Sequence, residues 1–84
     1  MKIIWTKHAE ARQKEWKIKL GITKEDVEAV LLDPDQVVPG EGEAMVAQKK
    51  WAEGLIRVPF IQVEGARKIL TVYYTSKIDR YWKG

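Results

Sequence analysis

One histidine near the N-terminus is the side chain in this sequence best suited to proton transfer. His8 is the only histidine among the 84 residues and stands in the stretch WTKHAEARQKEW. Arg12 follows four residues later, so a helix would place both side chains on one face. In the first turn of such a helix, the positive end of the dipole favours the neutral imidazole, which is the form that accepts a proton. The alternative is a histidine that only fixes a strand-to-helix turn through local hydrogen bonds.

A second candidate group lies in the C-terminal stretch TVYYTSKIDRYW. It places Tyr73, Thr75, Lys77, Arg80 and Tyr81 within nine residues, directly after an expected strand. Aromatic rings that stack on bases, interleaved with cations that contact phosphates, are common in RNA recognition. The alternative is that these tyrosines pack in the core or at the rim of a small β-containing domain.

Other kinds of catalytic site find no support in the sequence. There is no cysteine, and one histidine has no second histidine at a metal-ligand spacing, so we expect neither a metal site nor a cofactor. The sequence also lacks a glycine-rich phosphate loop, a G-x-S-x-G turn and a Ser/His/Asp arrangement.

Length and composition predict a single domain over residues 1–84, with no disulfides. The N-terminus contains an apolar run of only three residues before charges appear, too short for a signal-peptide core or a membrane span. We therefore expect a cytoplasmic protein that does not enter the membrane.

Charge is distributed in three blocks along the chain. Residues 1–24 carry a net charge of +5, residues 25–48 carry −7, and residues 49–84 carry +5. If the two basic blocks meet in the fold, they form a positive surface that attracts phosphates, and the acidic block lies elsewhere. The alternative is that these charges only solvate a domain in which 32% of residues are charged.

The elements that must position these residues begin with a strand over 2–6 and a helix over 7–19. Thr6 is suited to the N-cap of this helix, and Gly21 is a natural C-terminal stop. Thr23 and Asp26 have the spacing of a capping box, which predicts a second helix. This helix should end by Asp33, because the residue before a proline is disfavoured in the helical region.

The second half of the sequence predicts an antiparallel meander. Strands are expected at about 44–52, 55–63 and 67–75, separated by turns that contain glycine, and Gln36 to Val38 could pair briefly with a sheet edge. Pro59 cannot donate a ladder hydrogen bond, so it predicts a bulge or an unpaired position. Alternation puts Leu70, Val72 and Tyr74 on the face that the helices cover. The more open face then carries Thr71, Tyr73, Thr75 and Arg57.

Several short motifs together resemble a family of small prokaryotic proteins of unknown function. The pattern covers nearly the whole chain, and its most distinctive element is His-Ala after the first strand. Its parts are Thr6-Lys7-His8-Ala9 with Arg12, Gly21-Ile22, Glu25-Asp26-Val27 with Val30, Pro34, and the ending Tyr73-Tyr74-Thr75-Ser76-Lys77-Ile78-Asp79-Arg80-Tyr81. This family is similar in fold to the RelE/ParE and BrnT type toxins of bacterial toxin-antitoxin pairs.

The resemblance implies an α+β fold of order β-α-α-β-β-β, with two N-terminal helices packed on one face of a small antiparallel sheet. It also implies an endoribonuclease that cuts messenger RNA without a metal, with a cognate antitoxin-like protein as partner. Under this hypothesis the catalytic residues are His8 as base or acid, Tyr73 as a stacking or acid/base group, and Arg80 on the reacting phosphate. The residues expected to bind RNA phosphates are Arg12, Lys49, Arg57 and Lys77.

Two other functions remain open under the same resemblance. ParE-like toxins act on DNA gyrase, so the chain could instead be a non-catalytic module that binds nucleic acid or an acidic protein. It could also be a regulatory partner that accepts a segment of another protein at an open sheet edge.

Overall fold

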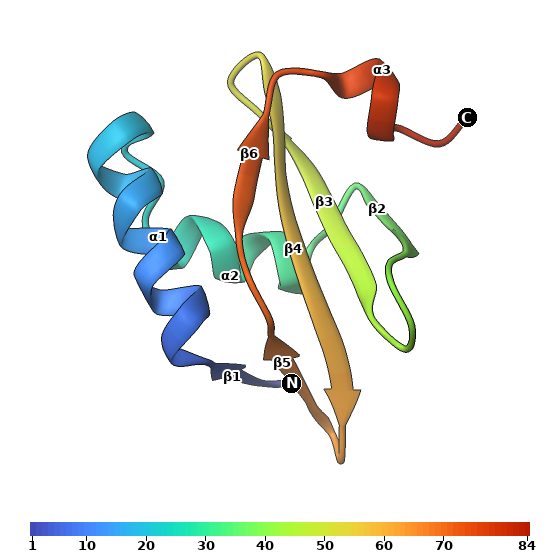
Figure 1. Ribbon diagram of the computed structural model, residues 1–84. Helices are drawn as coiled ribbons and strands as arrows, with labels where there is room; N and C mark the ends of the chain where they lie inside the picture. Colours follow the sequence, from blue (N-terminus) through green and yellow to red (C-terminus); the bar gives the residue numbers. More distant parts are fainter.

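A six-stranded mixed sheet organises the chain, and the computed structural model describes all residues, 1–84 (Figure 1). The strands have the order β1-β5-β4-β3-β2, and β6 pairs with β4. In chain order the elements are β1 (Lys2–Trp5), α1 (Lys7–Leu20), α2 (Lys24–Leu32), β2 (Gln36–Pro39), β3 (Met45–Trp51), β4 (Gly54–Val63), β5 (Ala66–Ile69), β6 (Tyr73–Thr75) and α3 (Ile78–Tyr81). The predicted α+β class, with two N-terminal helices, is confirmed.

Local capping signals determine both long helices. The Thr6 hydroxyl accepts a hydrogen bond from the Ala9 N–H at the start of α1. Gly21 ends α1 in the left-handed conformation, with φ of 77°, where a residue without Cβ is favoured. At α2 the capping box is complete, because Thr23 and Asp26 each bond the other's backbone N–H. These three features match the expectations from the sequence.

The sequence predicted a purely antiparallel sheet, but the sheet is mixed. Strand β1 runs parallel to β5, with Lys2 opposite Ala66 and Trp5 opposite Ile69. Parallel neighbours need a long connection, and here both helices and three strands separate the two in sequence. The pairs β2–β3, β3–β4, β4–β5 and β4–β6 are antiparallel, so the predicted C-terminal meander is present.

A one-residue bulge divides the last predicted strand into β5 and β6. Ile69 pairs with Phe60 and Tyr73 pairs with Arg57, so the three residues 70–72 lie opposite the two residues 58–59. The bulge falls opposite Pro59. Proline has no N–H to donate to the neighbouring strand, so it favours an interruption of regular pairing at this place. Because an extra residue reverses the alternation of faces, Ile69 and Val72 are both in the core. The expectation that Leu70 faces the helices is therefore wrong.

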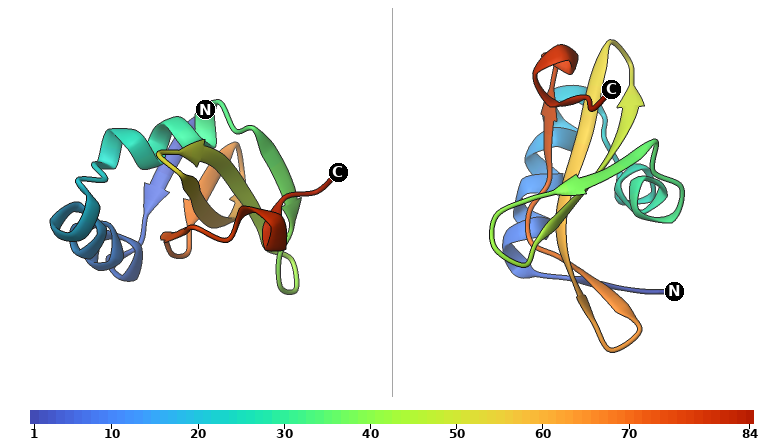
Figure 2. Two further views of the ribbon diagram at one scale, coloured as in Figure 1. Left: turned by 90° about the horizontal axis from the view of Figure 1, so that it is seen from above. Right: turned by 90° about the vertical axis from the view of Figure 1, so that its right-hand side faces the viewer.

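The hydrophobic core lies between one face of the sheet and the helices α1 and α2. Its buried members are Ala9, Ile22, Val27, Val30, Leu31, Ala47, Ile56, Val58, Phe60, Ile69 and Val72. Trp16 anchors α1 to the bulge, because its Nε1–H donates to the Val72 carbonyl at 3.1 Å. The short helix α3 lies on the opposite side of the strands from α2 (Figure 2). No helix is long and apolar enough to cross a membrane.

An ion pair links α1 to the start of α2. Lys24 Nζ donates to Glu10 Oε2 at 2.7 Å, and both side chains remain about 40% exposed. This hydrogen bond and the positive charge of Lys24 lower the pKa of Glu10 below its ordinary value. A carboxyl with a lower pKa in the folded state stabilises the fold above its ordinary pKa, and the contribution disappears as the pH falls through the folded pKa.

We therefore expect Glu10→Gln to lower the melting temperature slightly at pH 7 and by less at pH 3, because more of the wild-type carboxyl is protonated at the lower pH. Thermal unfolding at both pH values measures this difference. Glu15→Gln is the control, because Glu15 pairs with Arg12 within α1 and joins no second helix. An equal effect of Glu10→Gln at both pH values would contradict the linkage.

Candidate functional site

A cleft of about 710 Å³ lies on the side of the sheet away from the core. Its walls come from the β2–β3 turn, the middle of the sheet, the bulge and the C-terminal segment. The floor includes apolar groups such as Val46, Pro59 and Leu70. Its polar and charged side chains are Glu41, Arg57, Thr71, Tyr73, Arg80, Tyr81 and Lys83. Arginine, lysine and tyrosine therefore dominate the chemistry of the cleft.

Strand pairing places Arg57 in the middle of this face. It lies on β4 opposite Gln48 of β3 and opposite Tyr73 of β6, so all three side chains are on the same side of the sheet. Gly54 permits the close approach of β6, because a Cβ there would collide with the Thr75 carbonyl oxygen. The positions of Arg57 and Tyr73 thus depend on the register of two antiparallel pairs.

The Arg57 guanidinium is surrounded by uncharged groups. Nε donates to Gln48 Oε1 at 2.9 Å, and Nη1 donates to the Tyr73 hydroxyl. The Tyr81 ring lies over the guanidinium, with its centroid 4.1 Å from Cζ, and the Tyr73 centroid is 5.4 Å away. Arg57 is only 7% exposed. Aromatic faces attract such a cation without cancelling its charge.

No carboxylate forms an ion pair with a cation of the cleft. The four ion pairs of the chain involve Arg12, Lys24 and Lys49 as the cations, and none involves Arg57, Arg80 or Lys83. A buried cation without a counterion is costly unless an anion binds to it. The cleft therefore has the electrostatic character of an anion-binding site.

The C-terminal segment is attached to the sheet by two glutamines. Gln48 Nε2 donates to the Tyr81 carbonyl at 3.1 Å and to Gln36 Oε1 at 2.8 Å. Gln36 in turn bonds both the N–H and the carbonyl of Lys83. Lys50 adds a cation–π contact with the Trp82 ring, 4.4 Å from its centroid. These contacts hold Arg80, Tyr81 and Lys83 at the rim of the cleft.

Three of the residues predicted from the sequence meet in this cleft: Arg57, Tyr73 and Arg80. Lys77 lies beside it, in a shallow depression that shares Arg80 with the cleft. The two basic blocks do not meet in this cleft, since every cation that lines it comes from residues 49–84 and none from residues 1–24.

The other predicted residues lie elsewhere. His8 and Arg12 are exposed on α1 and do not line the cleft, and Arg12 pairs with Glu15 at 3.0 Å. Lys49 is on the other side of β3, where its Nζ donates to the Asp33 carbonyl at 2.7 Å. The structure therefore does not bring His8, Arg12 or Lys49 together with Arg57.

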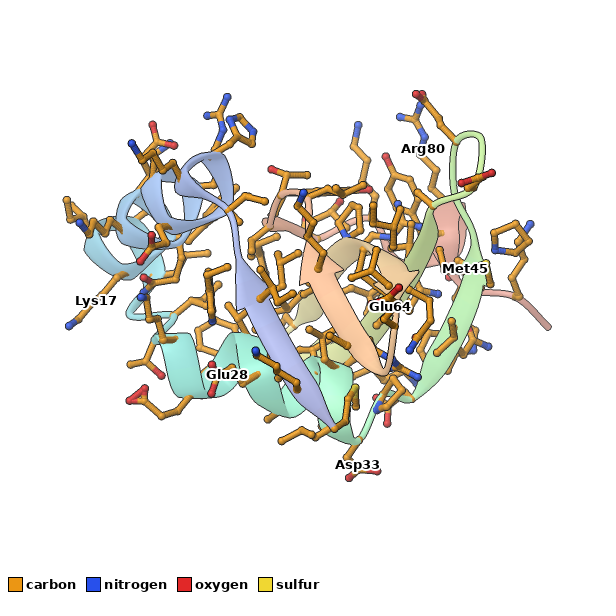
Figure 3. All side chains as sticks on the ribbon, turned by 90° about the horizontal axis from the view of Figure 1, so that it is seen from below. Lys17, Glu28, Asp33, Met45, Glu64 and Arg80 are labelled. Carbon is orange, nitrogen blue, oxygen red and sulfur yellow. The ribbon has the colours of Figure 1, made fainter.

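Most of the acidic block is separated from the cleft. Figure 3 shows Arg80 on one side of the sheet and Glu28 and Asp33 on the other. Glu41 is the exception, because it lies in the β2–β3 turn and is the only carboxylate that lines the cleft.

Sequence reasoning missed Glu41, Gln48 and Lys83 as members of the site. Gln48 gave one signal, since it interrupts an otherwise apolar start of β3. Its pairing with Arg57 depends on the register between β3 and β4. A single sequence does not reveal this register, because turns of different lengths between the two strands would each give a different register.

The side chains of the cleft are the basis for assigning its chemistry. Comparisons with protein-family models, with curated proteins and with solved structures found no match for the chain. No group of three or more His, Cys, Asp or Glu side chains is placed to hold a metal ion.

We expect inorganic phosphate to stabilise the protein by binding at the cleft. At ten times the dissociation constant, one bound anion stabilises the folded state by about 1.4 kcal/mol, which raises the melting temperature by several degrees. Arg80→Gln should reduce this shift, and Arg12→Gln, which removes an arginine outside the cleft, should not. Thermal unfolding in phosphate and in chloride at equal ionic strength measures the effect. Equal shifts in the two salts would exclude a specific anion site.

Proposed function

We propose that this chain is a toxin-like RNA-binding protein that acts as a metal-independent endoribonuclease on messenger RNA. The observation that carries the proposal is the buried, unneutralised Arg57, which lies in one cleft with Arg80 and two tyrosines. The α+β architecture with two N-terminal helices agrees with the fold implied by the resemblance to RelE/ParE-type toxins.

A phosphodiester is the anion that suits this cleft best. Guanidinium groups present several N–H donors in a plane, which match the oxygens of a phosphate. Arg80 lies over the same Tyr81 ring as Arg57, 5.5 Å from its centroid, so two guanidinium groups are close to one aromatic ring. A bound phosphate would supply a negative charge to Arg57 and Arg80, which form no ion pair with a carboxylate of the protein.

The tyrosines favour a nucleic acid over a free phosphate. Tyr73 and Tyr81 are half-buried, and their rings meet edge to face at 6.4 Å. Aromatic rings beside phosphate-binding cations stack on the bases of single-stranded RNA.

The same side chains suit cleavage by the ribose 2′-hydroxyl. The 2′-oxygen forms a bond to the adjacent phosphorus, and the bond from phosphorus to the 5′-oxygen breaks. Glu41 lines the cleft and would take the 2′-proton, and the arginines would stabilise the negative charge that builds up on the phosphate. The Tyr73 hydroxyl accepts a hydrogen bond from Arg57, which leaves its own proton free for the departing 5′-oxygen. The products are a 2′,3′-cyclic phosphate and a 5′-hydroxyl.

A toxin-like role also places the protein in the cytoplasm, where messenger RNA is found. It further includes a cognate antitoxin-like protein as partner. An acidic segment of that partner would complement the cations of the cleft.

We expect purified protein to cleave single-stranded RNA in the presence of EDTA. Arg80→Gln should slow cleavage by roughly 100-fold, since one charged transition-state contact is worth about 2.7–4 kcal/mol. Glu41→Gln should slow cleavage by a similar factor without weakening RNA binding, because it removes a proton acceptor and a negative charge. Gel electrophoresis of a labelled RNA measures the cleavage rate.

The matched controls are Arg12→Gln and Glu43→Gln, which remove the same charges from residues that do not line the cleft. Both should cleave at the wild-type rate. Arg80→Gln should also relieve the growth inhibition that the wild-type protein causes when it is expressed. Intact RNA at high concentrations of the wild-type protein would exclude the nuclease.

A non-catalytic binding module is the alternative, and one observation favours it. The only histidine of the chain lies outside the cleft, so the cleft lacks the commonest proton-transfer group of enzymes. RNA binding that weakens steeply with salt, without cleavage, would support this alternative.

A further inference from the structure

We infer that Gln48 is a positioning residue for the phosphate site, which aligns Arg57 without neutralising it and fixes the segment that carries Arg80. The inference rests on the proposed function, because the anion in question is an RNA phosphate. Gln48 is buried and would not contact the RNA itself. It would act on binding through the position and charge of Arg57.

Gln48 is fully buried, and its amide is fully used. It is 0% exposed. Its oxygen accepts from Arg57 Nε at 2.9 Å, and its nitrogen donates to Gln36 Oε1 at 2.8 Å and to the Tyr81 carbonyl at 3.1 Å. Arg57 and Tyr81 line the cleft, and Gln36 bonds the backbone of Lys83, which also lines it.

The neutral amide is chemically distinctive at this position. A buried arginine usually has a carboxylate partner, which orients the guanidinium and also cancels its charge. Gln48 supplies the same acceptor oxygen without the charge. The Tyr73 and Tyr81 rings compensate part of the cost of burying the cation. Arg57 is therefore held in place with its full charge available to a ligand.

Gln48 also connects the two halves of the anion site. Arg57 belongs to the sheet, whereas Arg80 and Lys83 belong to the C-terminal segment. The bond from Gln48 to the Tyr81 carbonyl joins them directly, and Gln36 extends the connection to the Lys83 N–H at 3.0 Å. These bonds attach the end of the short helix α3 to the sheet.

The test is the salt dependence of RNA binding by Gln48→Glu and Gln48→Met. The probe is a single-stranded RNA with 2′-O-methyl groups, which cannot be cleaved through the 2′-oxygen. Gln48→Glu places a carboxylate against Arg57, so we expect at least ten-fold weaker binding and a slope of log K against log salt smaller by about 0.7, the share of one phosphate contact. Gln48→Met keeps the charge of Arg57, so it should weaken binding and retain the wild-type slope.

Gln62→Glu is the matched control, because it makes the same change at an exposed residue of β4. It should bind with nearly wild-type affinity and slope. Near-ultraviolet circular dichroism shows whether each variant keeps its tertiary packing. If Gln48→Glu does not fold, Gln36→Leu tests the connection to the C-terminal segment instead. This variant breaks the bonds to Lys83 but leaves the bond between Gln48 and Arg57. It should weaken RNA binding several-fold.

Wild-type affinity and slope in a folded Gln48→Glu variant would overturn the inference while the proposed function stands. Wild-type affinity in Gln36→Leu would overturn the connection to the C-terminal segment. If the wild-type protein itself does not bind the RNA, the proposed function fails and the role of Gln48 fails with it. If it binds without cleaving, only the nuclease is excluded.

Discussion

Arg57 is buried on the central strand β4 without forming an ion pair, and the surrounding elements are arranged to accommodate its charge. The two strands that pair with β4 at Arg57 each contribute one uncharged partner, Gln48 from β3 and Tyr73 from β6. The C-terminal segment contributes the Tyr81 ring. An unpaired buried charge destabilises a small domain, and a ligand that carries the opposite charge would offset this cost.

The bulge opposite Pro59 allows one stretch of chain to serve two faces of the sheet. Without the extra residue, strict alternation from Ile69 would turn Tyr73 towards the helices and Val72 away from them. With it, Val72 is buried under Trp16, and Tyr73 reaches Arg57. The core and the cleft thus depend on the same local irregularity, which explains why the open face lies directly behind a well-packed one.

Sequence reasoning succeeded where the determining interactions are local. Both helix starts and the glycine end of α1 follow from neighbouring residues, and the cluster of tyrosines and cations was visible within a few residues of Tyr73. It failed where distant segments meet. The parallel pairing of β1 with β5, the shift at Leu70 and the partnership of Gln48 with Arg57 all depend on register between strands far apart in the sequence. His8 was predicted to be functional because of its residue type. Residue type alone does not tell whether its helix lies beside the cleft, and α1 contributes no residue to the cleft.

The central claim is that an RNA phosphate binds at Arg57, and nuclear magnetic resonance of the isotope-labelled protein tests it most directly. Titration with a 2′-O-methyl RNA should shift the Arg57 Nε–H signal and the backbone amides of Tyr73, Tyr81 and Lys83. The amides of residues 8–12 on α1 should remain unchanged. Shifts concentrated around His8 and Arg12, with no change at Arg57, would contradict the account and return the functional site to the N-terminal helix.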